Sequence, residues 1–447
     1  MIEYSALRQI MKKTIVEKIQ KRKYKPMLKP FYWLYHFVMA KIVLRKYKPT
    51  IIRKDDIRKE KESCFIVFNH LSRLDHLYVL ESVYPKSYNM MCAYNEFFRS
   101  HLSFNFKASK IIPKKQFAND PFSIKCVMNV FKKGGSVAIA PEGIATMYGE
   151  SHPQIPGTGR LIKMFKKPVY FIELRGQHLT TSWSSPKERI GKTFATTSLL
   201  LSKEDIEKMT AEEIDDLLDK VIYHDEYEWQ KQQQIEFSNI NTYYDRLEDF
   251  LYKCPKCGKE FKNIGKDGKF YCEECGNGFT LDNKYNMVPL NKDSIIFDTP
   301  TKWVERERKD IIEEIRKNPN FEIKVNVKIG QLPTYKPLKH LKTTEICGEG
   351  EIVINHNGMS FSGSKNGEPF SFLLPYSTLY TLIYTTSTKY FGTYVDGNYF
   401  EFYPEEKICG KLLLVVEEMH RYHVNYWANY KNKSYLYKGL ELGVDKK

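Results

Sequence analysis

The sequence predicts an α/β domain, followed by a small cysteine-bearing insert and a β-rich C-terminal region. Three apolar runs lie between residues 61 and 200, separated by stretches long enough for helices. Two CxxC pairs lie between residues 251 and 290. Beyond residue 350 the dipeptides Asn-Gly and Asp-Gly each interrupt a β-rich stretch, which is typical of tight hairpins. These three observations set the order of the predicted regions.

Length and charge bound the kind of protein this is. A chain of 447 residues is too long for one ordinary core, and its apolar content of 42% indicates a folded chain. The net charge of +16 predicts an anionic partner, which is a membrane surface, nucleic acid or a phosphorylated substrate. Residues 1–60 carry 17 Lys and Arg against 5 Asp and Glu, whereas residues 203–250 carry 5 against 15.

The basic N-terminal block predicts membrane association. Residues 1–30 read as a basic amphipathic helix broken near Pro26 and Pro30, followed by the aromatic segment Phe31 to Leu44. Trp and Tyr beside Lys and Arg suit the headgroup boundary of a bilayer. A helix over this segment would be about 21 Å long against a hydrocarbon core of about 30 Å. We expect residues 1–60 to associate with anionic lipids at the cytoplasmic face of a membrane, as a peripheral or monotopic protein. The alternative is a helix packed on the protein's own core.

Residues 61–250 predict the α/β domain, with an acidic helical extension over 203–250. Short apolar runs bounded by polar turns predict buried strands of a largely parallel sheet. The predicted strands are Cys64–Phe68, Ser136–Ala140 and Val169–Leu174. In the extension, Ser202 and Thr210 are each followed by acidic residues, so both are predicted helix N-caps.

The stretch "FNHLSRLDH" holds a candidate catalytic pair. His70 lies just past the first apolar run, where ligands bind in open parallel sheets, and Asp75 falls in the first turn of the next helix. A carboxylate on one ring nitrogen fixes the tautomer and leaves the other nitrogen basic, as general-base chemistry requires. Alone, the pair also fits a polar turn between a strand and a helix.

The stretch "GGSVAIAPEGIATMYGE" repeats the same layout. An apolar strand is followed by Pro141, Glu142 and Gly143 at its carboxyl end. Glu142 supplies a carboxylate where two strand ends could converge. Gly143 can adopt a backbone conformation closed to other residues and expose amides to a ligand.

In combination, these residues resemble successive motifs of the glycerolipid acyltransferases, the family of 1-acylglycerol-3-phosphate acyltransferase. The matching residues are Asn69-His70, Asp75, Pro141-Glu142-Gly143 and Pro168 before an apolar strand, over roughly residues 30–200. The resemblance implies an α/β fold with an amphipathic N-terminal anchor. It implies acyl transfer from acyl-CoA or acyl-acyl carrier protein to a lysophospholipid hydroxyl, with 1-acylglycerol-3-phosphate as the expected acceptor. His70 would remove the hydroxyl proton, Asp75 would orient His70, and Asn69, Glu142 and Gly143 would help bind the acceptor.

The sequence departs from the family pattern at the expected phosphate ligands. Ile144, Ala145 and Thr146 replace the small polar residue and arginine that usually follow Pro-Glu-Gly. The second family block reads "KIIPKKQF", where an arginine is usual. The basic residues that could substitute are Arg73, Lys114, Lys115 and Arg160. Each of them also fits a solvated surface charge.

The insert at 251–290 predicts a zinc ribbon. Cys254 and Cys257 form one CxxC pair, and Cys272 and Cys275 form another after a gap of 14 residues. Four thiolates suit tetrahedral Zn²⁺, and such a site has no open position, so it is structural. The competing interpretations are a redox pair and an iron–sulfur cluster.

The remaining segments predict a helical linker over 291–330 and a β-rich domain with a C-terminal helix over 331–447. The β-rich domain weakly resembles the pleckstrin-homology or GRAM type, and the alternative is a domain that only packs on the catalytic one. A zinc-ribbon nucleic-acid-binding or scaffold protein, or an inactive lipid-binding homologue, are the alternative functions. We expect no nucleic-acid partner, because the basic block adjoins aromatic residues and residues 203–250 are acidic.

Overall fold

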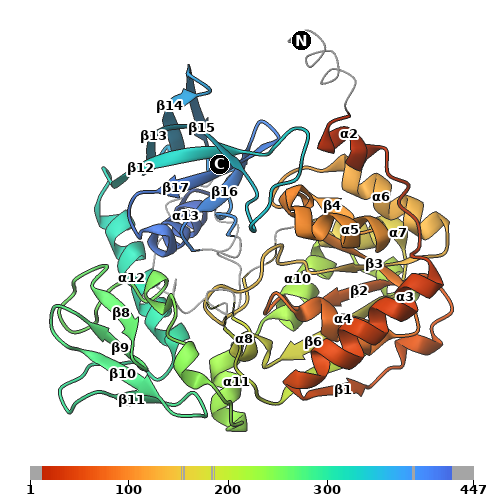
Figure 1. The fold of residues 1–447 in the computed structure, drawn as a ribbon, viewed down its shortest axis with the longest axis horizontal. Helices are drawn as coiled ribbons and strands as arrows, with labels where there is room; N and C mark the ends of the chain where they lie inside the picture. The colour runs from red at the N-terminus through yellow and green to blue at the C-terminus, as the bar shows by residue number, and fades with distance from the viewer. Residues whose placement is uncertain are drawn as a thin grey trace.

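The computed structural model describes residues 13–152, 154, 157–182, 185, 187–384 and 388–424. The described residues form a seven-stranded, a four-stranded and a six-stranded sheet. In Figure 1 the seven-stranded sheet and its helices occupy one side of the molecule, and the two smaller sheets lie on the other.

The seven-stranded sheet has the order β1-β7-β6-β2-β5-β3-β4. Its strands are β1 Pro49–Arg53, β2 Phe65–Phe68, β3 Tyr88–Ala93, β4 Ile112–Lys114, β5 Ser136–Ile139, β6 Val169–Arg175 and β7 Thr193–Leu201. The strands β2 to β6 run parallel, whereas β7 pairs antiparallel with β6 and β1 pairs parallel with β7. The three predicted strands are confirmed as β2, β5 and β6, and so is their parallel arrangement.

Helices cover both faces of this sheet. They include α3 Lys29–His36, α4 Asp75–Val83, α6 Pro121–Lys132, α7 Thr158–Phe165 and α10 Ala211–Ile222. Alternate residues of the fully buried strand β2 face opposite layers, as the two-residue period of a strand requires. Ile66 packs in one core with residues of α3 and α4, and Val67 packs in another with residues of α6, α7 and α10.

The N-terminal region is less regular than predicted. The helix α2 covers only Ile15–Gln20, and residues 1–12 of the predicted helix lie outside the described residues. Pro30 lies in the first turn of α3, so it begins a helix instead of breaking one, because the first turn needs no amide donor. The predicted helix over Phe31 to Leu44 is confirmed as α3 and the π-helical segment η1 Phe37–Val43. No described helix is long and apolar enough to cross a bilayer.

Short helices connect these elements. They are the 3₁₀ segments η2 Leu44–Tyr47, η3 Ile57–Lys59, η4 Tyr94–Phe98, η5 Ile240–Thr242 and η6 Leu247–Asp249, and the α-helices α5 Ser100–Ala108, α8 Gln177–Thr180, α9 Lys203–Lys208 and α11 Glu226–Gln233. Ser202 and Thr210 form reciprocal capping boxes at α9 and α10, which confirms both predicted N-caps.

The cysteine region forms the four-stranded antiparallel sheet, which the helix α12 Pro300–Lys317 follows. Its strands are β8 Asn263–Lys266, β9 Lys269–Cys272, β10 Gly278–Leu281 and β11 Met287–Pro289. The predicted helical linker over 291–330 is wrong at its C-terminal end, because Glu322–Gln331 is the strand β12. Apolar residues alternate through "EIKVNVKI", which is the pattern of a half-buried strand.

The six-stranded antiparallel sheet has the order β15-β14-β13-β12-β17-β16. Its other strands are β13 Glu345–Asn355, β14 Gly358–Lys365, β15 Glu368–Leu374, β16 Phe391–Val395 and β17 Asn398–Pro404, and the helix α13 Cys409–Val424 follows. The Asn357-Gly358 and Asp396-Gly397 signals join β13 to β14 and β16 to β17, as predicted. The β-rich character of the C-terminal region is confirmed, whereas the pleckstrin-homology or GRAM likeness stays a prediction.

A buried charge cluster joins the parts of the chain. Arg308 on α12 contacts Glu418 at 2.5 Å and Glu417 at 2.7 Å, both on α13. Its guanidinium also donates to the Tyr148 hydroxyl at 3.1 Å, and His152 approaches Glu417 at 3.6 Å. Tyr148 and His152 follow β5, so this cluster ties the C-terminal helix to the loop beyond that strand.

Candidate active site and cysteine cluster

Asp75, the first residue of α4, organises the loop that follows β2. Its carboxylate is buried and accepts hydrogen bonds from the amides of Leu71 at 2.7 Å and Ser72 at 2.9 Å. The Ser72 hydroxyl donates to the other carboxylate oxygen at 3.0 Å. A carboxylate is also favoured at a helix N-terminus, where backbone amides point toward it. Asp75 therefore fixes the loop's backbone as well as orienting a side chain.

His70 is the side chain that Asp75 orients. Its Nδ1 atom lies 2.8 Å from Asp75 Oδ2, and 25% of the side chain is exposed. This contact assigns the ring proton to Nδ1, which makes Nε2 the basic nitrogen. The arrangement can accept a proton from a substrate hydroxyl that reaches the exposed part of the ring. The structure thus brings together the predicted His–Asp pair.

Glu142 holds the backbone of His70 from the neighbouring strand. The strands β2 and β5 pair in parallel with Val67 opposite Ile139, so their carboxyl ends meet. The Glu142 carboxylate accepts from the His70 amide at 2.6 Å, and the Thr146 amide donates to the His70 carbonyl at 2.9 Å. The Glu142 side chain is fully buried, and burial raises its pKa well above 4.5. Its position is that of a support beneath His70.

Asn69 and Gly143 also serve the framework. Asn69 exchanges hydrogen bonds with the backbone of Leu174 at 3.0 and 2.7 Å, which extends the pairing of β2 and β6 past the strand end. Gly143 has a φ of +76°, and its amide donates to the Ala140 carbonyl within the turn. A side chain at Gly143 would come within 3.0 Å of the Phe117 ring. The Gly143 amide is therefore engaged in the turn.

The four predicted basic residues have partners in the structure. The Lys114 ammonium donates to the carbonyls of Lys115 and Ala118, and burial lowers its pKa. Lys115 donates to the Gly397 carbonyl in the C-terminal sheet at 2.7 Å. Arg160 is 76% exposed and lies 3.9 Å from Glu212. Arg73 is partly buried, and its charge interacts with Glu188 and Tyr47.

Sequence reasoning missed two residues that build this site. Ser72 stands three residues before Asp75, which is the spacing of a capping box, so the pattern was present in the sequence. Thr146 gave no such signal, because its amide reaches His70 only through the pairing of β2 with β5. Ile144, Ala145 and Thr146 are all buried, so the segment that replaces the expected arginine faces the interior.

The four predicted cysteine ligands form one cluster. Their Sγ atoms all lie within 4.8 Å of one another, with Cys254 and Cys275 at 3.6 Å and Cys257 and Cys272 at 3.8 Å. Each CxxC pair turns through a glycine with positive φ, Gly258 or Gly276, whose amide donates back to the first cysteine of the pair. The cluster could therefore hold a metal ion with four sulfur ligands.

One family model matches part of the first half of the chain. Residues 48–173 match the protein-family model described as Acyltransferase, and this segment contains His70, Asp75 and Glu142. The chain thus carries an acyltransferase-like α/β domain. Among solved structures, the 1-acyl-sn-glycerophosphate (LPA) acyltransferase PlsC from Thermotoga maritima is similar at 15% identity with a TM-score of 0.34, over 43% of this chain and 84% of that chain. A search of curated proteins finds no match.

The buried Glu142 carboxyl predicts a specific pH dependence. Because its folded pKa is raised above the unfolded value of 4.5, the folded chain holds the proton more tightly. The protonated Glu142 carboxyl therefore contributes to the free energy of unfolding at low pH. This contribution is lost as pH rises from about 4.5 toward the raised folded pKa. Glu142→Gln is neutral throughout and removes this loss. We expect the Tm of the parent chain to fall relative to that of E142Q when thermal unfolding is compared between about pH 5 and about pH 8.

The matched control is Glu204→Gln, which makes the same change at an exposed carboxylate on α9. Its Tm should track the parent chain at every pH. Identical pH profiles for E142Q and E204Q would show that Glu142 does not titrate as its burial requires.

Proposed function

We propose that this chain is an O-acyltransferase that moves an acyl group from a thioester donor to the hydroxyl of a lysophospholipid. The observation that carries the proposal is the His70–Asp75 pair at the carboxyl end of β2, within the segment that matches the acyltransferase family. Acyl-CoA or acyl-acyl carrier protein is the proposed donor, and 1-acylglycerol-3-phosphate is the proposed acceptor.

The proposed reaction needs one base and no covalent enzyme intermediate. The Nε2 atom of His70 takes the acceptor's hydroxyl proton while the oxygen attacks the thioester carbonyl. The C–O bond forms, and the resulting tetrahedral intermediate collapses with loss of the C–S bond. The proton held by His70 then passes to the departing thiolate. Asp75 stabilises the imidazolium that exists between these two transfers, and Glu142 keeps the His70 backbone in place.

Replacing either member of the pair should abolish most of the activity. We expect His70→Ala to lower kcat by about 10²–10⁴-fold, the usual worth of a general base, and Asp75→Asn to lower it through loss of the Nδ1 tautomer. The measurement is turnover of a labelled acyl thioester with a panel of lysophospholipids. His101→Ala removes an exposed histidine on α5 and should leave turnover unchanged. Normal turnover in H70A would refute the mechanism, whereas no turnover in the parent chain would favour an inactive lipid-binding homologue.

The cysteine cluster supports a second proposal, that the chain holds structural Zn²⁺. A tetrahedral ion with Zn–S bonds of about 2.3 Å separates its ligands by about 3.8 Å, close to the Sγ distances of 3.6 and 3.8 Å. The side-chain amide nitrogen of Asn277 lies 3.8 Å from Cys254 Sγ and donates toward it. Such a hydrogen bond orients and stabilises a metal-binding thiolate. The apolar side of this ribbon is buried, because Phe270 and Phe279 pack on Trp303 of α12. This packing favours a structural role over an independent nucleic-acid-binding module.

We expect the purified chain to carry about one Zn²⁺ per molecule by elemental analysis. Removal by a chelator should lower the Tm, because bound metal stabilises the folded state. Cys254→Ser should reproduce both effects, whereas Cys347→Ser, outside the cluster, should produce neither. Iron in place of zinc would overturn the proposal. A disulfide that is present in the parent chain and lost in C254S would also overturn it.

Peripheral membrane binding through α3 and η1 is the third part of the proposal. The outer side of this segment exposes large apolar side chains, among them Trp33 at 53% and Phe37 at 59%. The segment is anchored, because the buried His36 and the exposed Lys41 both contact Glu81 on α4. An exposed apolar stripe beside basic residues is the pattern of a helix that lies in the headgroup region. The cytoplasmic face is the proposed location.

Trp33→Ser with Phe37→Ser should weaken partition onto anionic vesicles by about tenfold or more, since two large apolar side chains lose their burial. Ile346→Ser with Leu373→Ser makes a similar change on the exposed C-terminal sheet and should not affect partition. Vesicle sedimentation at low and high salt measures both. If high salt abolishes vesicle binding and the chain instead binds DNA in a salt-dependent way, the nucleic-acid-binding alternative is favoured.

A further inference from the structure

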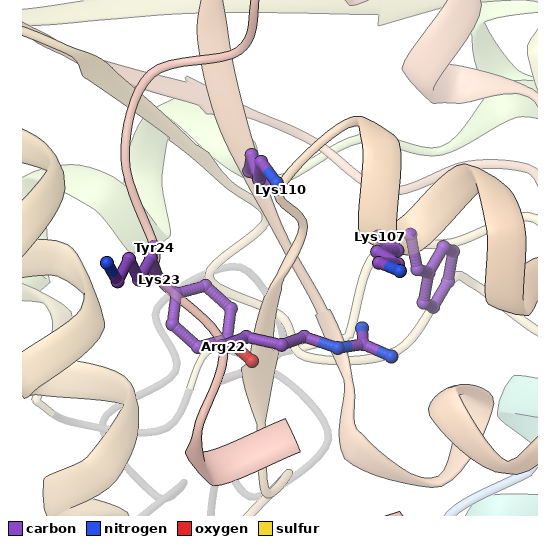
Figure 2. A pocket seen from close by; sticks show the side chains of 6 residues that line it. Arg22, Lys23, Tyr24, Lys107 and Lys110 are labelled. Carbon is purple, nitrogen blue, oxygen red and sulfur yellow. The ribbon is translucent and has the colours of Figure 1, made fainter. Parts of the chain in front are cut away.

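A basic cavity of about 150 Å³ lies between the segment that follows α2 and the turn from α5 to β4. Figure 2 shows the Arg22 side chain extending from that segment toward α5, which carries Lys107. Lys110 lies in the turn between α5 and β4. The lining residues are Arg22, Lys23, Tyr24, Phe106, Lys107 and Lys110.

This cavity lies at the opposite edge of the sheet from His70. Asn89, the second residue of β3, donates to the carbonyls of Lys25 and Lys110 at 3.0 Å each. Those contacts place the cavity at the amino ends of β3 and β4, which run parallel to β2 through β5. His70 follows the carboxyl end of β2. The cavity is therefore separate from the proposed catalytic site and stands independently of the acyl-transfer proposal.

The cavity has a strong excess of positive charge. Four of its six described lining residues are cationic, and none of the six is acidic. Within the described chain, the Nη1 atom of Arg22 is buried without a hydrogen-bond partner, and the guanidinium carbon lies 5.7 Å from the centroid of the Phe97 ring. A buried donor left unpaired costs on the order of 1–3 kcal/mol, and an anion in the cavity would offset that cost. Burial also lowers the pKa of the Arg22 guanidinium, which reflects its removal from water.

The size and donors of the cavity indicate a small oxyanion. Drug-sized ligands occupy roughly 300–1,000 Å³, so this cavity fits a single charged group and not a whole lipid or nucleotide. A planar guanidinium and ammonium groups are donors that suit phosphate oxygens, and the cavity is lined by residues that carry both. We propose that this cavity is a phosphate-group site.

The surroundings favour a phospholipid headgroup over free phosphate as the source of that group. Phe104, on α5 one turn before Lys107, is 77% exposed. Residues three apart share one face of a helix, so apolar and basic side chains stand together on α5. Acyl chains attached to a phosphate in the cavity could contact Phe104, which shares a face of α5 with the lining residue Lys107.

The test uses a double variant that carries both Arg22→Gln and Lys110→Gln. It is compared with a control double variant that loses the same charge. The control is Lys266→Gln with Lys328→Gln, two exposed lysines on the smaller sheets. Calorimetric titration with inorganic phosphate should show binding weakened about tenfold or more in R22Q/K110Q and unchanged in the control. Lys107→Gln, at an exposed position, should weaken binding by about threefold. Thermal unfolding of each variant verifies the fold.

Vesicle sedimentation identifies the source of the phosphate. The first vesicles are phosphatidylcholine with roughly one-fifth phosphatidic acid. The second vesicles have the same total charge, supplied by phosphatidylglycerol in place of phosphatidic acid. Loss of the preference for phosphatidic acid in R22Q/K110Q supports a lipid headgroup. A loss seen only with inorganic phosphate supports the same site with free phosphate as its ligand. If R22Q/K110Q binds phosphate and both vesicles as the control does, the site does not exist.

Discussion

The Asp75 carboxylate accepts hydrogen bonds from two backbone amides, a hydroxyl and an imidazole, and the geometry of the loop after β2 depends on it. A buried carboxylate is costly unless such donors replace its lost water, and charge-assisted hydrogen bonds are the strongest replacement. The same oxygen atom binds His70 and both loop amides, so the backbone contacts hold the carboxylate in place for the ring. The position of His70 is thus a property of the folded loop as a whole.

The second support of His70 extends this dependence to the rest of the chain. The backbone of His70 is bonded on both sides to the segment Glu142–Thr146, and Tyr148, two residues further, meets Arg308 of α12. Arg308 in turn binds Glu417 and Glu418 of α13. Removing one member of a buried ion cluster leaves an unpaired charge, which costs about 3–5 kcal/mol. The C-terminal region is therefore connected to the candidate catalytic loop through a continuous series of contacts.

How much the sequence could predict depends on whether a feature is local. The strands β2, β5 and β6 were visible because a buried parallel strand is continuously apolar, and the cysteine cluster was visible because each CxxC pair closes on itself. The strand β7 mixes threonines with leucines, and β4 has three residues including a proline, so neither pattern stood out. The role of Glu142 could not be read, since a carboxylate at a strand end looks the same whether it faces substrate or the neighbouring backbone. Only the pairing of β2 with β5 shows that it lies beneath His70.

The proposed membrane contact and the candidate site share one helix. The segment formed by α3 and η1 reaches Glu81 through His36 and Lys41, and Glu81 lies six residues after Asp75 on α4. At 1.5 Å per residue, the two carboxylates stand about 9 Å apart along that helix. A surface helix held by two contacts to α4 can bind lipid with its outer side while α4 stays in place. On the proposed membrane contact, the chain would then rest on a bilayer without any rearrangement of the loop that carries His70.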